Sequence, residues 1–331
     1  MFALVLVFFA CLVPARALER FEFTHPAMGT TFTITLYAPN KGTAEAGARE
    51  AFRRVDALED SMSDYQADSE LMQLCDKPSG SPVPVSADLF EVMERAQRIS
   101  GLSHGAFDIT VGPYVRLWRF ARKRKVLPTP AELAAAAPAV GYKKLRLDAK
   151  QRTVTLLVPN MRLDLGGIAK GYAADEALKV LKKHGLSCAL VAASGDIAIG
   201  DPPPDEPGWK VGIAAIDARN NETTRTLLLQ HCGISTSGDT EQFIEIGGVR
   251  YSHILDPATG LGLTNRIQAS SIAPDATTTD AAATTVCVLG VRQGLRFVES
   301  LPGTAALILT KRDDLKQSFA SRRFESLPVA E

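Results

Sequence analysis

The sequence has no excess of charge of either sign. It contains 37 basic and 37 acidic residues, so its formal net charge is zero. Proteins that bind nucleic acid mainly through its phosphates usually carry a basic excess. We therefore expect no nucleic-acid partner. One basic run, residues 119–125, is interpreted as a solvated face or loop.

Cysteine and histidine are scarce, with five of each in 331 residues. Four cysteines, Cys75, Cys188, Cys232 and Cys287, are widely spaced and mostly lie in apolar segments. This pattern is typical of buried thiols and not of a disulfide framework. No close Cys/His spacing indicates a zinc site. Disulfides in an oxidising compartment stay open as an alternative.

Long hydrophobic runs are absent except at the N-terminus, where residues 2–13 are continuously apolar. This run is too short to span a bilayer, and Ala15-Arg16-Ala17 after it fits the small-x-small pattern of signal peptidase. We predict a signal peptide over residues 1–17 and an exported, periplasmic protein. A lipid anchor at Cys11 is the lesser alternative, because Phe8-Phe-Ala-Cys11 is a poor lipoprotein cleavage site.

The rest of the chain has the composition of a globular protein, with 46% apolar and 22% charged residues. It shows no repeats and no convincing internal boundary, which predicts one domain over residues 18–331. Alternation predicts a strand at 31–37, and two apolar segments around a polar turn predict a hairpin over 145–158. Helical spacing predicts helices that begin at a Thr43 cap and at a Ser86 cap.

A possible metal site lies in residues 270–290, where a strand and a polar turn precede a helix expected to open near Thr278 or Thr279. Asp280 and Thr284 are four positions apart, so they share one helix face. Carboxylate and hydroxyl oxygens suit Mg²⁺, and the free N–H groups of a helix start attract phosphate. A magnesium pyrophosphate fits there. The alternative is that both residues simply cap the helix.

A second glycine-bearing motif is Asp164-Leu-Gly-Gly-Ile-Ala-Lys170. A short strand is expected to deliver Asp164 to the paired glycines, and a helix is expected to continue to about Lys183. Paired glycines let a backbone approach a ligand closely, and Lys170 adds a positive charge. Tight helix–strand packing is an equal alternative for the glycines.

In this order, the motifs resemble the FAD:protein FMN transferase family, the ApbE-like flavin transferases. The segments that carry this resemblance are distributed over nearly the whole mature chain. The matching segments are Met28-Gly-Thr30, the loop with Tyr65 and Ser69-Glu-Leu71, Phe107-Asp-Ile109, residues 164–175, Ser235-Thr-Ser-Gly-Asp239, residues 253–260, and residues 280–284.

The resemblance implies an exported, Mg²⁺-dependent enzyme with FAD as its substrate. Such an enzyme transfers the FMN half of FAD to a threonine hydroxyl of a partner protein and releases AMP. The implied acceptors are flavoprotein subunits of membrane redox complexes. A loose association of the enzyme with the membrane is compatible with such acceptors. The implied fold is one compact α+β domain with mixed, largely antiparallel sheets and packed helices.

The resemblance also implies a set of site residues. Metal ligands map to Asp280, Thr284 and a backbone oxygen of Gly167. For the base that deprotonates the acceptor, His253 is our hypothesis and Asp239 the next candidate, since imidazole titrates near neutral pH. Two other functions stay open, an FAD diphosphatase and a non-catalytic periplasmic flavin carrier. The implied flavin contacts are Met28, Tyr65, Phe107, Asp108, Asp164 and Lys170.

Overall fold

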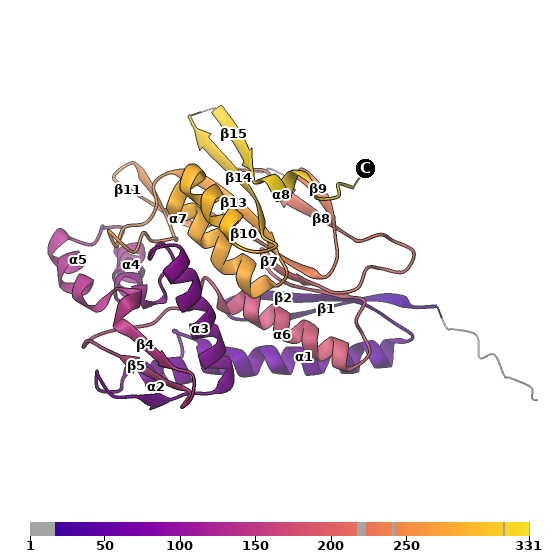
Figure 1. The fold of residues 1–331 in the computed structure, drawn as a ribbon, viewed down its shortest axis with the longest axis horizontal. Coiled ribbons are helices and arrows are strands. Elements are labelled where there is room, and N and C mark those ends of the chain that lie inside the picture. The colour runs from indigo at the N-terminus through magenta and orange to yellow at the C-terminus, as the bar shows by residue number, and fades with distance from the viewer. Residues whose placement is uncertain (1–16, 217–222, 240–241, 314, 331) are drawn as a thin grey trace, which may run out of the picture.

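The computed structural model describes residues 17–216, 223–239, 242–313 and 315–330. Its main feature is an eight-stranded sheet in the order β1-β2-β6-β7-β10-β13-β14-β15, in which each neighbouring pair is antiparallel (Figure 1). The strands are β1 (Glu19–Ala27), β2 (Thr30–Ala38), β6 (Ala189–Ala193), β7 (Asp196–Ile199), β10 (Cys232–Gly238), β13 (Arg266–Ala273), β14 (Ala305–Arg312) and β15 (Leu315–Ala320).

The first hairpin shows how the sequence directs this sheet. Phe32, Ile34 and Leu36 are fully buried, and threonines alternate with them along β2. The predicted strand at 31–37 is therefore confirmed, with one more residue at each end. Met28 and Gly29 form the two-residue turn and both have positive φ, 49° and 70°, as turns that match strand twist require.

Helices cover one face of the sheet and enclose the larger hydrophobic core. Ser86 caps its helix as predicted, because its side chain accepts the Leu89 N–H. The Thr43 cap is wrong: Asn40 accepts the Thr43 N–H, so the cap and the helix start lie three residues earlier. The helices on this face are α1 (Lys41–Met62), α3 (Ala87–Leu102), α6 (Ala169–Lys183) and α7 (Ala276–Ser300), of which α6 and α7 lie side by side (Figure 1).

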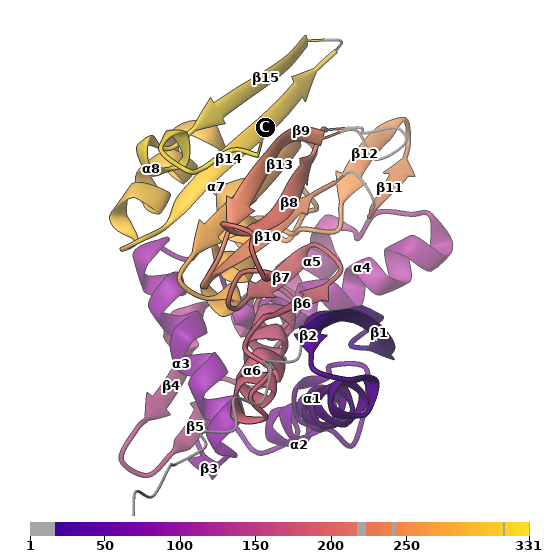
Figure 2. The same cartoon turned by 90° about the vertical axis from the view of Figure 1, so that its right-hand side faces the viewer.

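The other face of the sheet has a second, smaller core. Its residues come from β7, β10, β13 and β14 and from a hairpin formed by β8 (Trp209–Ala214) and β9 (Thr223–Leu229). Figure 2 shows this hairpin in front of β10 and β13. Phe324 of the short helix α8 (Arg322–Glu325) is fully buried there.

The remaining elements surround the two layers. The predicted hairpin over 145–158 is confirmed as β4 (Leu145–Asp148) and β5 (Thr153–Leu156), with β3 (Val83–Pro84) added to it. The others are α2 (Glu70–Cys75), α4 (Gly112–Arg124), α5 (Pro130–Ala136), the 3-10 turns η1 (Ile109–Val111), η2 (Ala137–Ala139) and η3 (Tyr142–Lys144), and the hairpin of β11 (Phe243–Ile246) and β12 (Val249–Ser252).

The α+β fold class with antiparallel sheets and packed helices is thus confirmed. Of the predicted signal peptide, residues 1–16 lie outside the described residues. Within the described ranges, no helix has both the length and the apolar character needed to cross a membrane. Cys75 and Cys287 are buried thiols, as expected, while Cys188 and Cys232 are only half-buried and all four are free.

Candidate active site

The two glycine-bearing motifs meet where α6 packs against α7. A Cβ atom on Gly171 would lie 2.2 Å from the Ala276 carbonyl oxygen and 2.9 Å from the Asp280 Cβ. Only glycine permits this approach, because any side chain at position 171 would push the helices apart. Gly171 therefore serves the packing of α6 on α7, a contact that the sequence reasoning did not predict, and that packing places Asp280 beside the start of α6.

Asp280 is 2% exposed, and its Oδ2 accepts a hydrogen bond of 3.0 Å from the Gly171 backbone N–H. Gly171 is the third residue of α6, so its N–H has no acceptor within its own helix. The first helical bond is made by Tyr172 N–H to Ile168 O. In the part of the chain that the structure describes, the Gly167 carbonyl receives no backbone N–H and Asp280 Oδ1 no hydrogen bond.

Thr284 lies one helical turn beyond Asp280 and faces the same turn. A Cβ atom on Gly167 would lie 3.5 Å from Thr284 Oγ1 and 3.2 Å from Phe107 Cε2. Ser237 Oγ of β10 lies 3.2 Å from Thr284 Oγ1 on the other side. The structure therefore brings together the three residues predicted as metal ligands.

The donor types fit Mg²⁺, which prefers hard oxygen ligands and usually keeps several from water or substrate. They comprise one carboxylate, one hydroxyl and the Gly167 backbone. No cluster of three or more His, Cys, Asp or Glu side chains able to hold a metal occurs among the described residues. A cation here would hence rely on these oxygens and on substrate oxygens.

The charges around Asp280 favour a cation. Burial raises the pKa of Asp280 to about 7, and repulsion from Asp196 adds to the rise, while Lys170 and the Gly171 N–H oppose it. Lys170 forms an ion pair with Asp196. Burial opposes its charge, but Asp280 and Asp196 outweigh burial and raise the pKa of Lys170 above its ordinary value. A divalent cation would stabilise the ionised form of Asp280.

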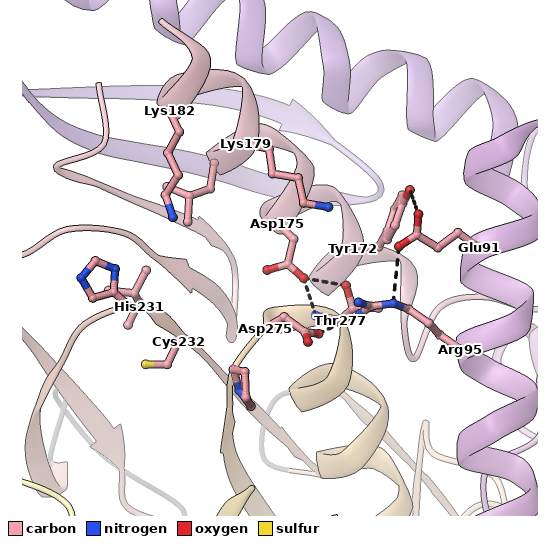
Figure 3. Close-up of a pocket in the computed structure, with 13 residues that line it drawn as sticks. Glu91, Arg95, Tyr172, Asp175, Lys179, Lys182, His231, Cys232, Asp275 and Thr277 are labelled. Carbon is pink, nitrogen blue, oxygen red and sulfur yellow. Dashed lines mark hydrogen bonds and ion pairs between the residues drawn. The ribbon is translucent and has the colours of Figure 1, made fainter. Parts of the chain in front are cut away.

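The expected anion site at the start of α7 is wrong. The helix begins at Ala276, and Asp275 accepts the Thr278 N–H at 2.8 Å. Asp175 accepts the N–H group of Ala276 at 2.9 Å. It also accepts the N–H group of Thr277 at 2.8 Å (Figure 3). Since these groups already have carboxylate partners, they are not free to bind phosphate.

A cavity of about 200 Å³ lies beside this helix start (Figure 3). Arg95, Lys179 and Lys182 line it together with Asp175 and Asp275. None of the ten residues predicted from the sequence lines it. The cavity is therefore separate from the cluster around Asp280.

Tyr65 lies in the loop between α1 and α2 and is 79% exposed. The guanidinium carbon of Arg119, on α4, lies 3.9 Å from the centroid of its ring, and Arg119 also pairs with Asp64. This cation–π contact fixes an otherwise exposed aromatic ring. The ring thus has a defined position.

Asp164 belongs to an extended loop and not to the predicted strand. Its backbone N–H donates to Ile109 O at 2.8 Å, and its Oδ1 accepts the Gly166 N–H at 2.8 Å. Burial raises the pKa of Asp164 to about 6, and the charge of Asp64 adds to the rise. The strand prediction failed because the next segment turns into α6 without a pairing partner.

Phe107 is 5% exposed and packs against Gly167, while Asp108 makes its contacts within the chain. Asp108 Oδ1 accepts from the Thr110 N–H at 2.8 Å and from its hydroxyl at 2.6 Å, and Oδ2 accepts the Tyr142 N–H at 2.7 Å. The structure gives this carboxylate a role in organising its loop. The flavin contacts assigned to Asp108 and to Met28, which is half-buried in the β1–β2 turn, stay predictions.

His253 follows β12 and is half-buried, and its Nδ1 lies 3.0 Å from the Gln242 carbonyl oxygen. A carbonyl only accepts, so Nδ1 carries the proton and Nε2 of the neutral ring has a free lone pair. Burial lowers the pKa of His253, and Arg122 and Lys170 lower it further against the opposing effect of the Gln242 carbonyl. A neutral imidazole near pH 7 suits a general base.

Asp239, the second candidate base, is 3% exposed and lies 2.8 Å from the Nε atoms of both Arg250 and Arg266. Both contacts are made by its Oδ2, so this oxygen already has two guanidinium partners. Sequence reasoning missed four residues that shape the site: Arg119, Asp196, Gly171 and Ser237. Gly171 and Ser237 lie within the segments that resemble the family, Asp196 lies outside them, and Arg119 lies in the basic run interpreted as a solvated face or loop.

Comparison with known proteins supports the family resemblance found in the sequence. The sequence profile of the ApbE family matches residues 28–308. A Vibrio cholerae protein named FAD:protein FMN transferase is 32% identical over 330 residues, covering 98% of this chain and 96% of its own. An Escherichia coli K12 protein of the same name is 31% identical, covering 84% of this chain and 80% of its own.

Solved structures agree with the sequence relatives. The flavin transferase ApbE of Vibrio cholerae superposes with a TM-score of 0.84 at 31% identity, covering 94% of this chain and 99% of that one. The apo form of the Pseudomonas stutzeri flavinyl transferase ApbE gives a TM-score of 0.82 at 28% identity, covering 94% and 97%.

The fold and these relatives define the class: the chain is an enzyme of flavin transfer. It belongs to the ApbE family, whose curated members carry the name FAD:protein FMN transferase.

Proposed function

We propose that the enzyme transfers the FMN half of FAD to a threonine hydroxyl of an exported acceptor protein, in a Mg²⁺-dependent reaction that releases AMP. The observation that carries the proposal is the junction of α6 and α7. There the Gly171 N–H is directed to Asp280, the Gly167 carbonyl has no backbone donor, and Thr284 Oγ1 faces Gly167. Asp280, Thr284 and the Gly167 carbonyl would hold the metal.

Mg²⁺ bound there would neutralise charge on the pyrophosphate of FAD. Lys170 adds a fixed positive charge next to Asp280, and the Asp196 ion pair holds its ammonium in place. Phe107 is buried against Gly167, so its ring would limit the space beside a bound pyrophosphate and help to exclude water from this turn. These residues orient the pyrophosphate for attack from one direction.

The transfer forms one bond and breaks one. The acceptor hydroxyl oxygen attacks the phosphorus of the FMN half, and the bond from that phosphorus to the bridging oxygen breaks, so AMP leaves with that oxygen. The hydroxyl proton passes to Nε2 of His253, whose Nδ1–H is held by Gln242 O. A neutral imidazole accepts this proton without a prior deprotonation step.

The acceptor and the compartment belong to the same proposal. An N-terminal signal over residues 1–17 would place the enzyme in the periplasm, and the fitting acceptors are flavoprotein subunits of membrane redox complexes. The apolar run at residues 2–13 and the Ala15-Arg16-Ala17 pattern support export.

The test is incubation with FAD, Mg²⁺ and a candidate acceptor subunit, followed by in-gel flavin fluorescence and AMP measurement. We expect equal amounts of protein-bound flavin and AMP. Both products should be lost when the acceptor threonine is replaced with valine. Release of free FMN with AMP and no labelled protein would instead identify an FAD diphosphatase. FAD binding without AMP would identify a carrier.

A further inference from the structure

The solvent-facing side of α4 and the turn after it carry an unneutralised basic surface. Its residues face away from the buried stripe of Tyr114, Trp118 and Ala121. On a helix, Arg116, Phe120 and Lys123 fall on one side at i, i+4 and i+7. We define the α4 surface as Arg116, Phe120, Lys123, Arg124, Lys125 and Val126, all of which are exposed.

Acidic residues are absent from this part of the chain. Between Asp108 and Glu132 the sequence has six basic residues and no Asp or Glu. Arg119 is paired with Asp64. The other basic side chains here, from Arg116 to Lys125, form no ion pair with any described residue, so their charge is available to an external partner. Because the whole chain is neutral, this local excess is a feature of one face.

Large apolar side chains are exposed among these charges. Phe120 is 53% exposed and Val126 is 61% exposed. The neighbouring β11–β12 hairpin adds Phe243 and Val249, which are 41% and 42% exposed. The hairpin is attached to α4 through Trp118 and Tyr251, whose ring centroids lie 5.5 Å apart, and Figures 1 and 2 both place it at the α4 end of the molecule.

We propose that the α4 surface docks the enzyme on an anionic phospholipid bilayer. Basic residues interspersed with single exposed Phe and Val side chains match the two attractions that hold proteins at such an interface, charge to the headgroups and apolar insertion. Arg119 of the same helix packs on Tyr65, so docking places the predicted flavin contact near the membrane. This inference does not depend on the chemistry of transfer.

Binding of the chain without its predicted signal peptide to vesicles tests the proposal. Vesicles of equimolar phosphatidylglycerol and phosphatidylcholine are compared, by co-sedimentation, with vesicles of phosphatidylcholine alone. Wild-type protein should bind only the anionic vesicles and lose binding as salt screens the charges. The variant K123Q/R124Q/K125Q should bind about 100-fold more weakly, since each cation near such a surface contributes about fivefold.

Two further variants separate surface position from total charge and from folding. K150Q/K182Q/K183Q removes the same charge from three exposed lysines away from α4 and should bind like wild type. Phe120→Ser should weaken binding several-fold at unchanged charge. Thermal unfolding of each variant checks that the fold is kept. The proposal would be overturned by equal binding to neutral vesicles or by equal losses in the two triple variants. It would also be overturned if the wild-type protein bound no vesicles, a result that would favour an acidic protein partner.

Discussion

Asp280 and Gly171 lie 109 positions apart in the sequence and are joined by one hydrogen bond, from the Gly171 N–H to Asp280 Oδ2, of 3.0 Å. Asp280 therefore satisfies a donor at the start of α6, a helix to which it does not belong. Its own helix, α7, is capped by Asp275. Capping and metal binding are thus not exclusive for Asp280, because one carboxylate oxygen serves the helix and the other stays available.

Two substitutions at Asp280 should separate these roles. Asp280→Asn keeps an acceptor for the Gly171 N–H but removes the anionic ligand, so Mg²⁺-dependent turnover should be lost with the fold kept. Asp280→Ala should also lose turnover and in addition cost about 1–3 kcal/mol, because a buried N–H is left unsatisfied. Urea unfolding and Mg²⁺ titration measure the two effects. Wild-type metal dependence in either variant would refute the ligand role.

Gly171→Ala tests the close approach of the two helices. The added methyl group would lie 2.2 Å from the Ala276 carbonyl oxygen. We expect a loss of about 1–3 kcal/mol in the free energy of unfolding, as for other overpacked sites. Gly101→Ala is the matched control, because nothing lies within 4 Å of a Cβ atom there. That change should stabilise α3 by about 0.5–1 kcal/mol.

Asp164 should make stability fall as pH rises. Its pKa is about 6 in the folded protein against an ordinary 3.8, so between these values the folded state binds more protons than the unfolded state. The free energy of unfolding therefore decreases from pH 3.8 to pH 6 and this contribution is lost above pH 6. Asp164→Asn should flatten the decrease in urea unfolding across that range. Asp60→Asn, at an exposed position, should leave it unchanged.

Tyr65 should contribute to FAD binding through its ring, which Arg119 holds from one side. Tyr65→Ala should weaken FAD binding by about 1 kcal/mol, or roughly fivefold in Kd, as for other aromatic contacts. Tyr65→Phe keeps the ring and should bind FAD like wild type. Fluorescence titration of FAD measures both. Equal Kd values for the alanine variant and wild type would return Tyr65 to an ordinary turn residue.

Local patterns predicted the elements more reliably than the termini of helices. Alternation identified β2, and helical spacing with Ser86 identified α3, because these signals lie within one segment. The cap of α1 was missed because Asn40 and Thr43 both suit the position, and only the backbone decides which side chain accepts. Likewise, nothing near Ala276 in the sequence shows that Asp175, on another helix, occupies its N–H.

The predicted site shows the same limit. Spacing placed Asp280 and Thr284 on one face, the family resemblance implied Gly167, and the structure places Gly167 beside Thr284. Two charged groups shift the pKa of Asp280, namely Asp196 and Lys170. They form an ion pair between α6 and β7 that depends on the fold. Long-range pairs of this kind have no local signal. The family resemblance placed the residues, while the physical reasons for their pKa shifts came from burial.

His253 provides the sharpest test of the proposed transfer. Its Nδ1–H donates to Gln242 O, and burial with Arg122 and Lys170 lowers its pKa, so the ring is neutral with Nε2 free to accept a proton. If Nε2 takes the proton of the acceptor hydroxyl, His253→Gln should bind FAD nearly normally yet lose about two to four orders of magnitude in turnover. Single-turnover rates at saturating FAD and the Kd for FAD measure the two effects.

The pH profile distinguishes a base from a positioning residue. Protonation of the wild-type ring removes the acceptor at Nε2, so turnover should fall at pH values below the lowered pKa of His253. His253→Gln should lose this acidic limb along with its rate, since glutamine does not titrate. Its fold should be kept, because a glutamine amide can still donate to Gln242 O. Weakened FAD affinity with near-normal turnover at saturation, and an unchanged acidic limb, would make His253 a binding residue and leave the base to another group.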